Sequence, residues 1–131
     1  MTATDANAGA GTSVRPAIDP ADFRATLSRF CSGVTVLAGF GEDGAPVGLT
    51  CQSFTSLSLT PPLVLVCPGR NSTSWPRIGR SGRFSVNVLA QDQQNVCSAL
   101  GRSGPDKFTG VRWRRTDRGA LVIDGAIAWM D

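Results

Sequence analysis

Residues 48–68 of this chain read GLTCQSFTSLSLTPPLVLVCP, a run of hydroxyl side chains set between two apolar segments. Ser53 and Thr55 interrupt the alternation of the first segment, so we expect a bulge or bend within residues 53–56. The prolines at 61 and 62 end that strand, and the LVLVC run that follows is typical of a fully buried central strand. One face of the first segment is expected to be buried through Leu49, Cys51, Leu57 and Leu59.

The segment before this stretch predicts a β-hairpin. GVTVLAGFGEDGAPVGLTC reads as two strands joined by a turn at residues 39–44. GFGEDG has the G-x-G-x-x-G spacing of a dinucleotide fingerprint, but that fingerprint must open a helix, whereas an extended Ala-Pro-Val segment follows here. Glu42 and Asp43 would also repel a phosphate. We therefore interpret GFGEDG as a hairpin loop.

Three helices and four further strands are expected in the rest of the chain. DPADFRATLSRFCSG predicts a helix capped by Asp19 and ended by Gly33, with an apolar stripe of Phe23, Leu27 and Phe30. RNSTSWPRIGRSG leads into a short helix that Ser72, Thr73 or Ser74 can cap, and QDQQNVCSALG predicts another. RFSVNVL, with alternating faces, and VRWRR, ALVI and AIAWM are expected to be strands.

This order of elements argues against a doubly wound parallel sheet, which needs a longer helix after most strands. The predicted fold class is mainly β, an antiparallel barrel with peripheral helices. Residues 1–15 are expected to be a disordered N-terminal arm and residues 16–131 a single domain. Because the chain stops at Asp131, directly after an apolar segment, we expect a barrel whose last strands are missing.

The composition excludes several kinds of chemistry. The chain has no histidine, which rules out Ser-His-Asp triads, Cys-His pairs and histidine-ligated zinc. The cysteines are too widely spaced for a metal site, so no metal is expected, and we interpret them as buried free thiols of a reducing, cytoplasmic protein. No apolar run approaches the ~20 residues of a membrane span. The cysteines are Cys31, Cys51, Cys67 and Cys97.

The net charge is +3, and Lys107 is the sole lysine among the basic residues. Arginine favours bidentate recognition of anions, so one interpretation of the positive charge is a phosphate ester or nucleic-acid partner, and the alternative is that it keeps the protein in solution. A nucleic-acid-binding barrel ranks low, because such proteins stack bases on exposed aromatic side chains and this chain has no tyrosine. No nucleic-acid partner is therefore expected.

Two polar clusters are candidates for a ligand site. The hydroxyl run, with its amide at Gln52, can hold the edge of a planar heterocycle, and residues 71–74 lie at a helix start that suits a phosphate. Arg70, Arg77 and Arg80 can add positive charge. Together the clusters favour a phosphorylated cofactor. The alternative is that these side chains face solvent on strands and cap helices, which serine and threonine commonly do.

From Asp19 to Asp131 the chain resembles the flavin reductase family, the NAD(P)H-dependent partners of two-component flavin monooxygenases. The resemblance rests on TCQSFTSLSLTPPLVLVCP, STSW and SGRFSVNVL in this order, with FCSGVTVL and GPDKFTGVRW around them. It implies an FMN-binding split β-barrel of antiparallel, Greek-key topology. It also implies a homodimer with flavin bound near the dimer interface.

The implied activity is reduction of FMN or FAD by NADH or NADPH, with the reduced flavin passed to a partner oxygenase. Hydride transfer needs two stacked rings and no obligatory side-chain base, so no catalytic residue is assigned. Family members continue with a Gly-Asp-His motif that contributes to nicotinamide binding, and this sequence lacks it. The alternative is therefore a flavin-binding module without turnover.

The resemblance also implies which residues bind the flavin. Thr73 and Ser74 would meet the phosphate, as the helix start already indicated. Phe54 and Trp75 are interpreted mainly as core residues, and Lys107 and Phe108 match a family block near the site. The ring and ribityl chain would be lined by Val47, Gly48, Leu49, Thr50, Gln52 and Ser53, with Cys67, Pro68 and Gly69 passing close to the flavin.

Overall fold

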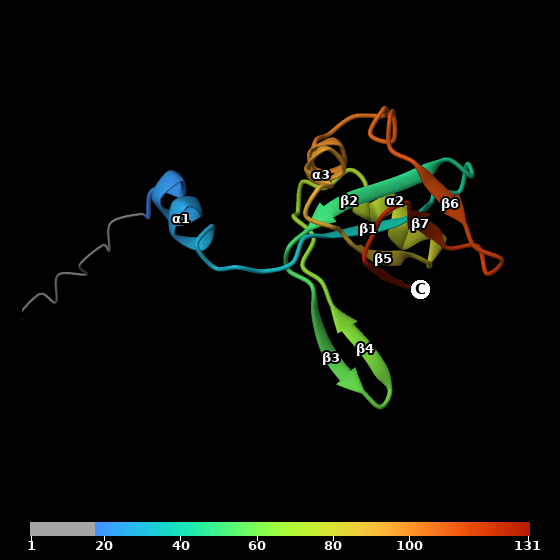
Figure 1. Ribbon diagram of the computed structural model, residues 1–131, viewed down its shortest axis with the longest axis horizontal. Helices are drawn as coiled ribbons and strands as arrows, with labels where there is room; N and C mark the ends of the chain where they lie inside the picture. Colours follow the sequence, from blue (N-terminus) through green and yellow to red (C-terminus); the bar gives the residue numbers. More distant parts are fainter. Residues whose placement is uncertain (1–17) are drawn as a thin grey trace, which may run out of the picture. The chain divides into compact units, whose positions relative to one another are not determined.

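The computed structural model describes residues 18–131, and the chain divides into one unit up to Cys31 and a second over Ser32–Asp131 (Figure 1). The predicted arm at residues 1–15 lies outside the described residues. No helix in residues 18–131 is both long enough and apolar enough to cross a membrane.

Helix α1 of the first unit spans Pro20–Leu27. Its predicted cap is confirmed, because Asp19 Oδ1 accepts a hydrogen bond from the Ala21 N–H at 2.6 Å. The predicted end at Gly33 is wrong, since the helix stops at Leu27. The side chains of the predicted apolar stripe, Phe23, Leu27 and Phe30, are exposed.

The second unit is built on a four-stranded antiparallel sheet in the order β2-β1-β5-β8. Two separate hairpins, β3-β4 and β6-β7, accompany it, and β7 packs against β1 and β5. The strands of the sheet are β1 (Thr35–Phe40), β2 (Pro46–Cys51), β5 (Ser85–Val88) and β8 (Ala128–Met130). The hairpins are β3 (Thr55–Leu59) with β4 (Pro62–Leu65), and β6 (Trp113–Arg115) with β7 (Leu121–Ile123).

The turn between β1 and β2 confirms the interpretation of GFGEDG as a hairpin loop. The Gly41 N–H donates to the Ala45 carbonyl and the Gly44 N–H to the Gly41 carbonyl, each at 2.9 Å. Gly44 has a φ of 75°, which favours glycine because it has no Cβ. No helix follows this turn, so it offers no dinucleotide cradle.

Both faces of the sheet are buried, because alternate residues of β1 enter different cores. Helix α2 (Trp75–Ser81) covers one face, where Leu37 packs with Ile78 and Val86. On the other face Val36 and Ala38 pack among residues from α3 (Gln94–Gly101) and β7. The helices predicted within RNSTSWPRIGRSG and QDQQNVCSALG are confirmed at Trp75–Ser81 and Gln94–Gly101, and they cover the sheet from two sides.

The β3-β4 hairpin contradicts the expected burial of this region. It extends away from the sheet (Figure 1), and β4, which contains most of LVLVC, is exposed along its whole length. Leu57 and Leu59 are also exposed, by 60% and 88%. Within Ser32–Asp131, the other strands and helices leave these side chains uncovered. The apolar side chains of this run, which are of types usually found buried, are therefore exposed in the described part of the chain.

The expected irregularity near residues 53–56 takes two forms. Strand β2 ends at Cys51 and β3 begins at Thr55, and the β3-β4 register shifts between Ser56 and Ser58.

Cysteine burial was predicted incorrectly at Cys31 and Cys67, which are exposed, whereas Cys51 is buried and Cys97 half-buried.

Strand β5 carries two polar side chains that are wholly buried, Ser85 and Asn87. Asn87 Oδ1 accepts from the Ile123 N–H at 2.9 Å, and Asn87 Nδ2 donates to the Leu121 carbonyl at 3.3 Å. Ser85 Oγ also donates to the Leu121 carbonyl. These side-chain bonds hold β7 against the sheet, although β7 does not pair with β5 as a neighbouring strand. The alternating pattern of RFSVNVL could not predict these bonds.

We expect Asn87→Ala to lower the free energy of unfolding by roughly 2–3 kcal/mol, because the buried Ile123 N–H loses its acceptor. Urea denaturation measures the change. The control is Asn95→Ala, an exposed asparagine on α3, for which we expect a change within about 0.5 kcal/mol. Equal losses for the two variants would contradict this role of Asn87.

Candidate functional site

A cavity of about 270 Å³ lies between the beginning of β2, the beginning of α2 and the loop after α3. Four of the predicted ligand residues line it: Val47, Gly48, Thr73 and Ser74. The cavity is also lined by Arg77 from α2 and by Lys107 and Phe108 from the loop. The tertiary structure thus brings together the Val-Gly segment and the Thr-Ser pair, which are far apart in the sequence.

Gly48 is required by the close approach of the Phe108 ring. A Cβ at position 48 would lie 3.0 Å from Phe108 Cζ and 3.3 Å from the Leu37 carbonyl oxygen. Because few real Cβ contacts are this short, a larger residue would push the loop away from β2. Glycine therefore sets the separation between the two walls of the cavity.

Lys107 is 92% buried and donates hydrogen bonds only to neutral oxygens. Its Nζ lies 3.0 Å from Ser74 Oγ, 3.4 Å from the Gly48 carbonyl and 3.3 Å from the Leu100 carbonyl. Burial lowers the pKa of Lys107 from its ordinary value of 10.5, because water no longer solvates the ammonium. The ammonium therefore connects β2, α2 and the end of α3 at the cavity.

The hydroxyls at the start of α2 have separate tasks. Ser72 Oγ accepts from the Trp75 N–H at 3.1 Å, so among the three candidate caps it is Ser72 that makes the capping bond. Ser74 makes no capping bond with its side chain and instead accepts from Lys107. Thr73 is exposed at the cavity wall.

Of the three arginines expected to add charge, only Arg77 lines the cavity. It forms an ion pair with Asp43 at 3.0 Å, from the β1-β2 turn. The pKa of Asp43 is lowered, first by the hydrogen bond from the Ala45 N–H and also by the Arg77 guanidinium. Arg80 lies outside the cavity and pairs with Glu42 at 3.3 Å.

A second group of predicted residues gathers at the other end of β2. Ser53 Oγ accepts from the Cys67 N–H at 2.9 Å and lies 3.3 Å from the Cys67 carbonyl oxygen. Gln52 and Gly69 are exposed, and Pro68 is half-buried. Because the cavity and this group flank opposite ends of one strand, a ligand that touches both must be elongated and lie along β2.

The side chains of Leu49 and Thr50 do not reach either group. Leu49 is buried in the core beneath α2, and Thr50 Oγ1 donates to the Cys97 carbonyl at 2.8 Å. Since β2 is an edge strand of the sheet, its backbone has a side that no other strand pairs with. These two residues can therefore contact a ligand through the backbone alone.

Phe54 and Trp75 pack against the core, in agreement with their interpretation as core residues.

Two basic residues that line the cavity, Lys107 and Arg77, were not among the assigned flavin contacts. The resemblance had placed Lys107 in a family block near the site, but nothing in its polar loop predicts that this lysine is buried. Arg77 had been grouped with Arg70 and Arg80 by charge alone. The packing of the loop on β2 and α2 shows which of these basic residues reach the cavity.

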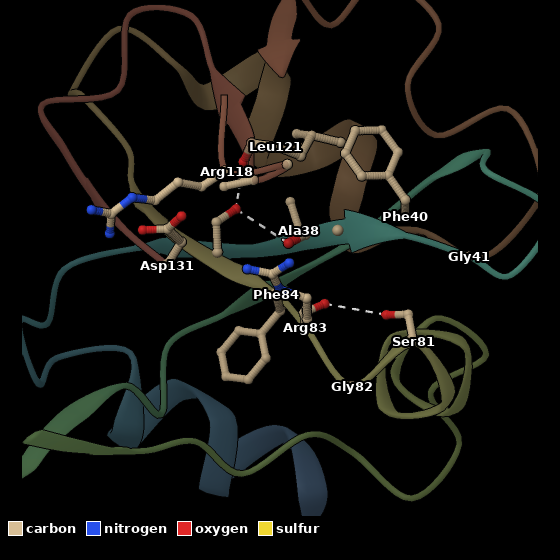
Figure 2. A pocket seen from close by; sticks show the side chains of 14 residues that line it. Ala38, Phe40, Gly41, Ser81, Gly82, Arg83, Phe84, Arg118, Leu121 and Asp131 are labelled. Atoms are coloured by element: carbon tan, nitrogen blue, oxygen red, sulfur yellow. Dashed lines mark hydrogen bonds between the residues drawn. The ribbon is translucent and has the colours of Figure 1, made fainter. Parts of the chain in front are cut away.

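A larger hollow, of about 450 Å³, contains none of the predicted residues. It lies where the ends of β1 and β5 approach the turn before β7, with Phe84, Arg118 and Asp131 at its wall (Figure 2). The buried hydroxyl there, Ser85 Oγ, already bonds to the carbonyls of Ala38 and Leu121. The cavity beside Lys107 is therefore the better candidate, because its hydroxyls and its buried charge point to an anionic ligand.

Residues 27–131 match the sequence profile of the family described as Flavin reductase like domain. The chain is 49% identical to a protein of Rhodococcus jostii named flavin-dependent monooxygenase, reductase subunit HsaB, over 94% of this chain and 63% of that protein. It thus spans a little over three fifths of this curated relative.

Solved structures show the same fold. Nitrilotriacetate monooxygenase component B from Mycobacterium thermoresistibile superposes with a TM-score of 0.77 at 50% identity, covering 85% of this chain and 62% of that one. The NADH:FAD oxidoreductase SgcE6 of Streptomyces globisporus, in complex with NAD and FAD fragments, gives 0.69 at 36% identity, covering 88% and 72%. The predicted mainly β, split-barrel fold with peripheral helices is confirmed, and the sheets formed by residues 18–131 do not close into a barrel.

The lowered pKa of Lys107 predicts how stability depends on pH. Between that lowered pKa and 10.5, the unfolded chain still holds the proton that the folded chain has lost, so the free energy of unfolding rises with pH. Lys107→Met lacks this rise. Urea denaturation of both proteins at several alkaline pH values tests the difference, because the two proteins share every other ionisable group. Parallel pH curves would contradict the shifted pKa.

Proposed function

We propose that this chain, which belongs to the flavin reductase like domain family, binds FMN or FAD and reduces it with NADH or NADPH. The reduced flavin would then pass by diffusion to a partner oxygenase, as expected for the reductase of a two-component monooxygenase. The observation that carries the proposal is the cavity in which Ser74, Thr73 and the buried Lys107 meet beside an open strand edge.

The residues present fit a flavin nucleotide. Ligand pockets commonly measure ~300–1,000 Å³, so a cavity of about 270 Å³ suits one end of such a ligand better than the whole. The hydroxyls and basic groups of the cavity match a phosphate, and the polar group around Ser53 matches the edge of a ring at the other end of β2. An elongated flavin nucleotide meets both requirements.

A bound flavin supplies the chemistry by accepting a hydride from the nicotinamide ring. The protein residues would act by orientation and exclusion of water. Thr73 and Ser74 would hold the phosphate end, and the backbone of β2 and the Cys67–Gly69 loop would hold the ring. No side chain with a pKa near neutrality is required, which fits a chain without histidine.

The decisive assay mixes the full chain with NADH or NADPH and with FMN or FAD, and follows the absorbance of the reduced nicotinamide. We expect oxidation that depends on flavin, and the four combinations identify the preferred pair. The SgcE6 complex with NAD and FAD fragments supports NADH and FAD as the first pair to test. A folded chain that oxidises neither nucleotide in the presence of either flavin would contradict the reductase activity.

Flavin binding without turnover is the second candidate function. It is favoured by the cavity itself, whose lining residues fit one end of a flavin nucleotide and include none that we assign to a nicotinamide ring. Quenching of flavin fluorescence measures binding without any nicotinamide nucleotide, so binding and turnover are tested separately. Binding without oxidation would select this second function, and no binding would reject both. We propose a cytoplasmic location for either function.

We further propose that the chain forms a homodimer through the β3-β4 hairpin. Its exposed apolar residues are Leu57, Leu59, Leu63, Val64 and Leu65, and residues 55–65 contain no charged side chain. A patch of this kind is typical of a protein interface. A second copy carries the same uncharged surface, so two hairpins can cover each other around a twofold axis.

Leu59→Asp tests the dimer, because the new carboxylate would be buried without a partner. We expect the wild-type chain to have the mass of a dimer in light scattering after size-exclusion chromatography, and the variant to shift towards the monomer. Gln91→Asp adds the same charge at an exposed loop position and should keep the dimer. A monomeric wild type, or a variant that stays dimeric, would contradict the proposed interface.

We expect Ser74→Ala to weaken FMN binding by about 1 kcal/mol, roughly fivefold in Kd, because one hydroxyl is lost from the phosphate end. Fluorescence titration measures the Kd. Ser98→Ala, at an exposed position of α3, is the control and should bind FMN like the wild type. If Ser74→Ala binds FMN as tightly as the control, the phosphate lies elsewhere.

A further inference from the structure

We propose that the β6-β7 hairpin, together with β8, is a docking surface for a partner protein that presents carboxylates around an apolar side chain. The inference goes beyond the proposed function, in which reduced flavin leaves by diffusion and no protein contact is needed. Two properties of the surface carry it: arginines without counter-ions, and an exposed apolar strand beside them.

The hairpin concentrates positive charge. Residues 112–118 read RWRRTDR, so four positive charges and one negative charge give a net +3, equal to the net charge of the whole chain. The side chains of these four arginines are exposed. Solubility alone is served by charges of both signs scattered over a surface, whereas clustered like charges repel one another. A partner with carboxylates would relieve this repulsion. The arginines are Arg112, Arg114, Arg115 and Arg118.

These arginines have no carboxylate partner within the second unit. The ion pairs of that unit instead join α2 to the β1-β2 turn. Asp117 lies in the hairpin turn, and Asp131 lines the larger hollow together with Arg118 (Figure 2), but neither carboxylate forms an ion pair with the hairpin. The arginine side chains that donate hydrogen bonds in this unit are those of Arg77 and Arg102. The donors of the hairpin arginines are therefore free for a partner.

Stacking on aromatic rings orients two of the guanidiniums without using their donors. Arg114 Cζ lies 5.8 Å from the centre of the Trp129 ring on β8, and Arg115 Cζ lies 3.7 Å from the centre of the Phe40 ring on β1. A stacked guanidinium turns its face to the ring, so the N–H groups at its edge can still bind a carboxylate with two parallel hydrogen bonds. Because these side chains are already held, binding costs them less entropy.

Strand β8 supplies the apolar part of the surface. Trp129 and Met130 are each 41% exposed, and Ile127, just before the strand, is 70% exposed. Arginine, tryptophan and methionine are enriched at protein interfaces and lysine is depleted there; residues 111–131 contain no lysine. A hollow of about 350 Å³ lies between the hairpin turn and the indole, and it can take one apolar side chain. It is lined by Arg114, Arg115, Thr116, Asp117, Arg118 and Trp129.

The arrangement of the charges favours a protein over a nucleic acid. Arg114 and Arg115 are consecutive on β6 and therefore point to opposite faces, so their charges spread over a wide surface instead of converging on one phosphate. A base would have to stack on the exposed indole of Trp129, but Arg114 already occupies a face of that ring.

The hairpin also adjoins the candidate site. Trp113 of β6 packs edge-on against Phe40, with ring centres 5.6 Å apart, and Phe40 pairs in register with Pro46, which lines the cavity beside Lys107. A partner docked on the hairpin would therefore lie next to the cavity end of β2.

The first experiment uses three fluorescein-labelled hexapeptides, EELFEE, EESGEE and QQLFQQ, and a labelled thymidine hexanucleotide. Fluorescence anisotropy gives the Kd of each probe for the wild-type chain. We expect EELFEE to bind at least about tenfold tighter than QQLFQQ, which lacks the carboxylates, and about threefold tighter than EESGEE, which lacks the apolar residues. The affinity for EELFEE should fall as salt is raised, because exposed charges are screened.

A matched pair of double variants locates the binding. Arg114→Glu with Arg118→Glu reverses two charges on the hairpin, and Arg29→Glu with Arg102→Glu reverses two exposed charges outside it. The net charge changes equally in both proteins, and circular dichroism checks that each is folded. We expect the hairpin variant to bind EELFEE at least about tenfold more weakly than the control variant.

The second experiment needs only the wild-type chain, so it remains informative if the hairpin variant does not fold. Backbone amide resonances of the ¹⁵N-labelled protein are followed during titration with EELFEE. We expect the shifts to be confined to β6, β7 and β8. Shifts centred elsewhere, or no shifts, would overturn the docking surface.

The remaining outcomes are equally decisive. Equal binding of EELFEE and EESGEE would show charge attraction without a docking surface, and a hexanucleotide that binds as tightly as EELFEE would replace the protein partner with a nucleic acid. Equal losses in the two double variants would also contradict the proposal. The peptide titrations contain no flavin. A chain that binds neither flavin but binds EELFEE on the hairpin would therefore lose the proposed function and keep the docking surface.

Discussion

The burial of both faces of β5 is the constraint on which the rest of the second unit depends. Val86 enters the core beneath α2, so Ser85 and Asn87 must point into the opposite core, where water cannot solvate them. Their hydrogen bonds go to the backbone of β7 at Leu121 and Ile123. A strand with a polar inner face thus specifies which segment must cover it, because any other cover would leave these groups unpaired.

The covering segments in turn position the candidate site. The α3-side core, in which β7 lies, includes Val111 and has Phe108 packed at its edge. Phe108 approaches Gly48 on β2, and the preceding residue places the Lys107 ammonium against Ser74 at the start of α2. The loop that carries the charge is therefore fixed by packing on both sides. A site built this way keeps its geometry without a ligand, which reduces the entropic cost of binding.

Under the proposed function, the two polar groups along β2 would let a chain with no histidine serve redox chemistry. Transfer of a hydride between stacked rings makes few demands on acid–base residues, but it requires that the flavin be held at both ends. An edge strand with hydroxyls at each end and one buried cation would provide this. The exposed β3-β4 hairpin adjoins the Ser53 end of the strand, so a second copy bound there would lie near the same region.

Local patterns in the sequence were sufficient for the hairpin at GFGEDG, for the helices at Trp75–Ser81 and Gln94–Gly101, and for the short strands near the C-terminal end. Each depends on turn residues, caps or alternation within a few positions. The hydroxyls at Thr73 and Ser74 were found in the same way. The order of sequence blocks also indicated the family and its fold.

Tertiary structure alone decided which apolar and charged residues are buried. LVLVC has the composition of a central strand but is exposed on a hairpin, whereas Lys107 has the setting of a solvent-facing loop but is buried. Burial is not a property of a segment, because it depends on what the rest of the chain, or a second chain, packs against it. For the same reason the hydroxyls at the cavity could be located from sequence, whereas the burial of Lys107, which the resemblance placed only in a block near the site, could not.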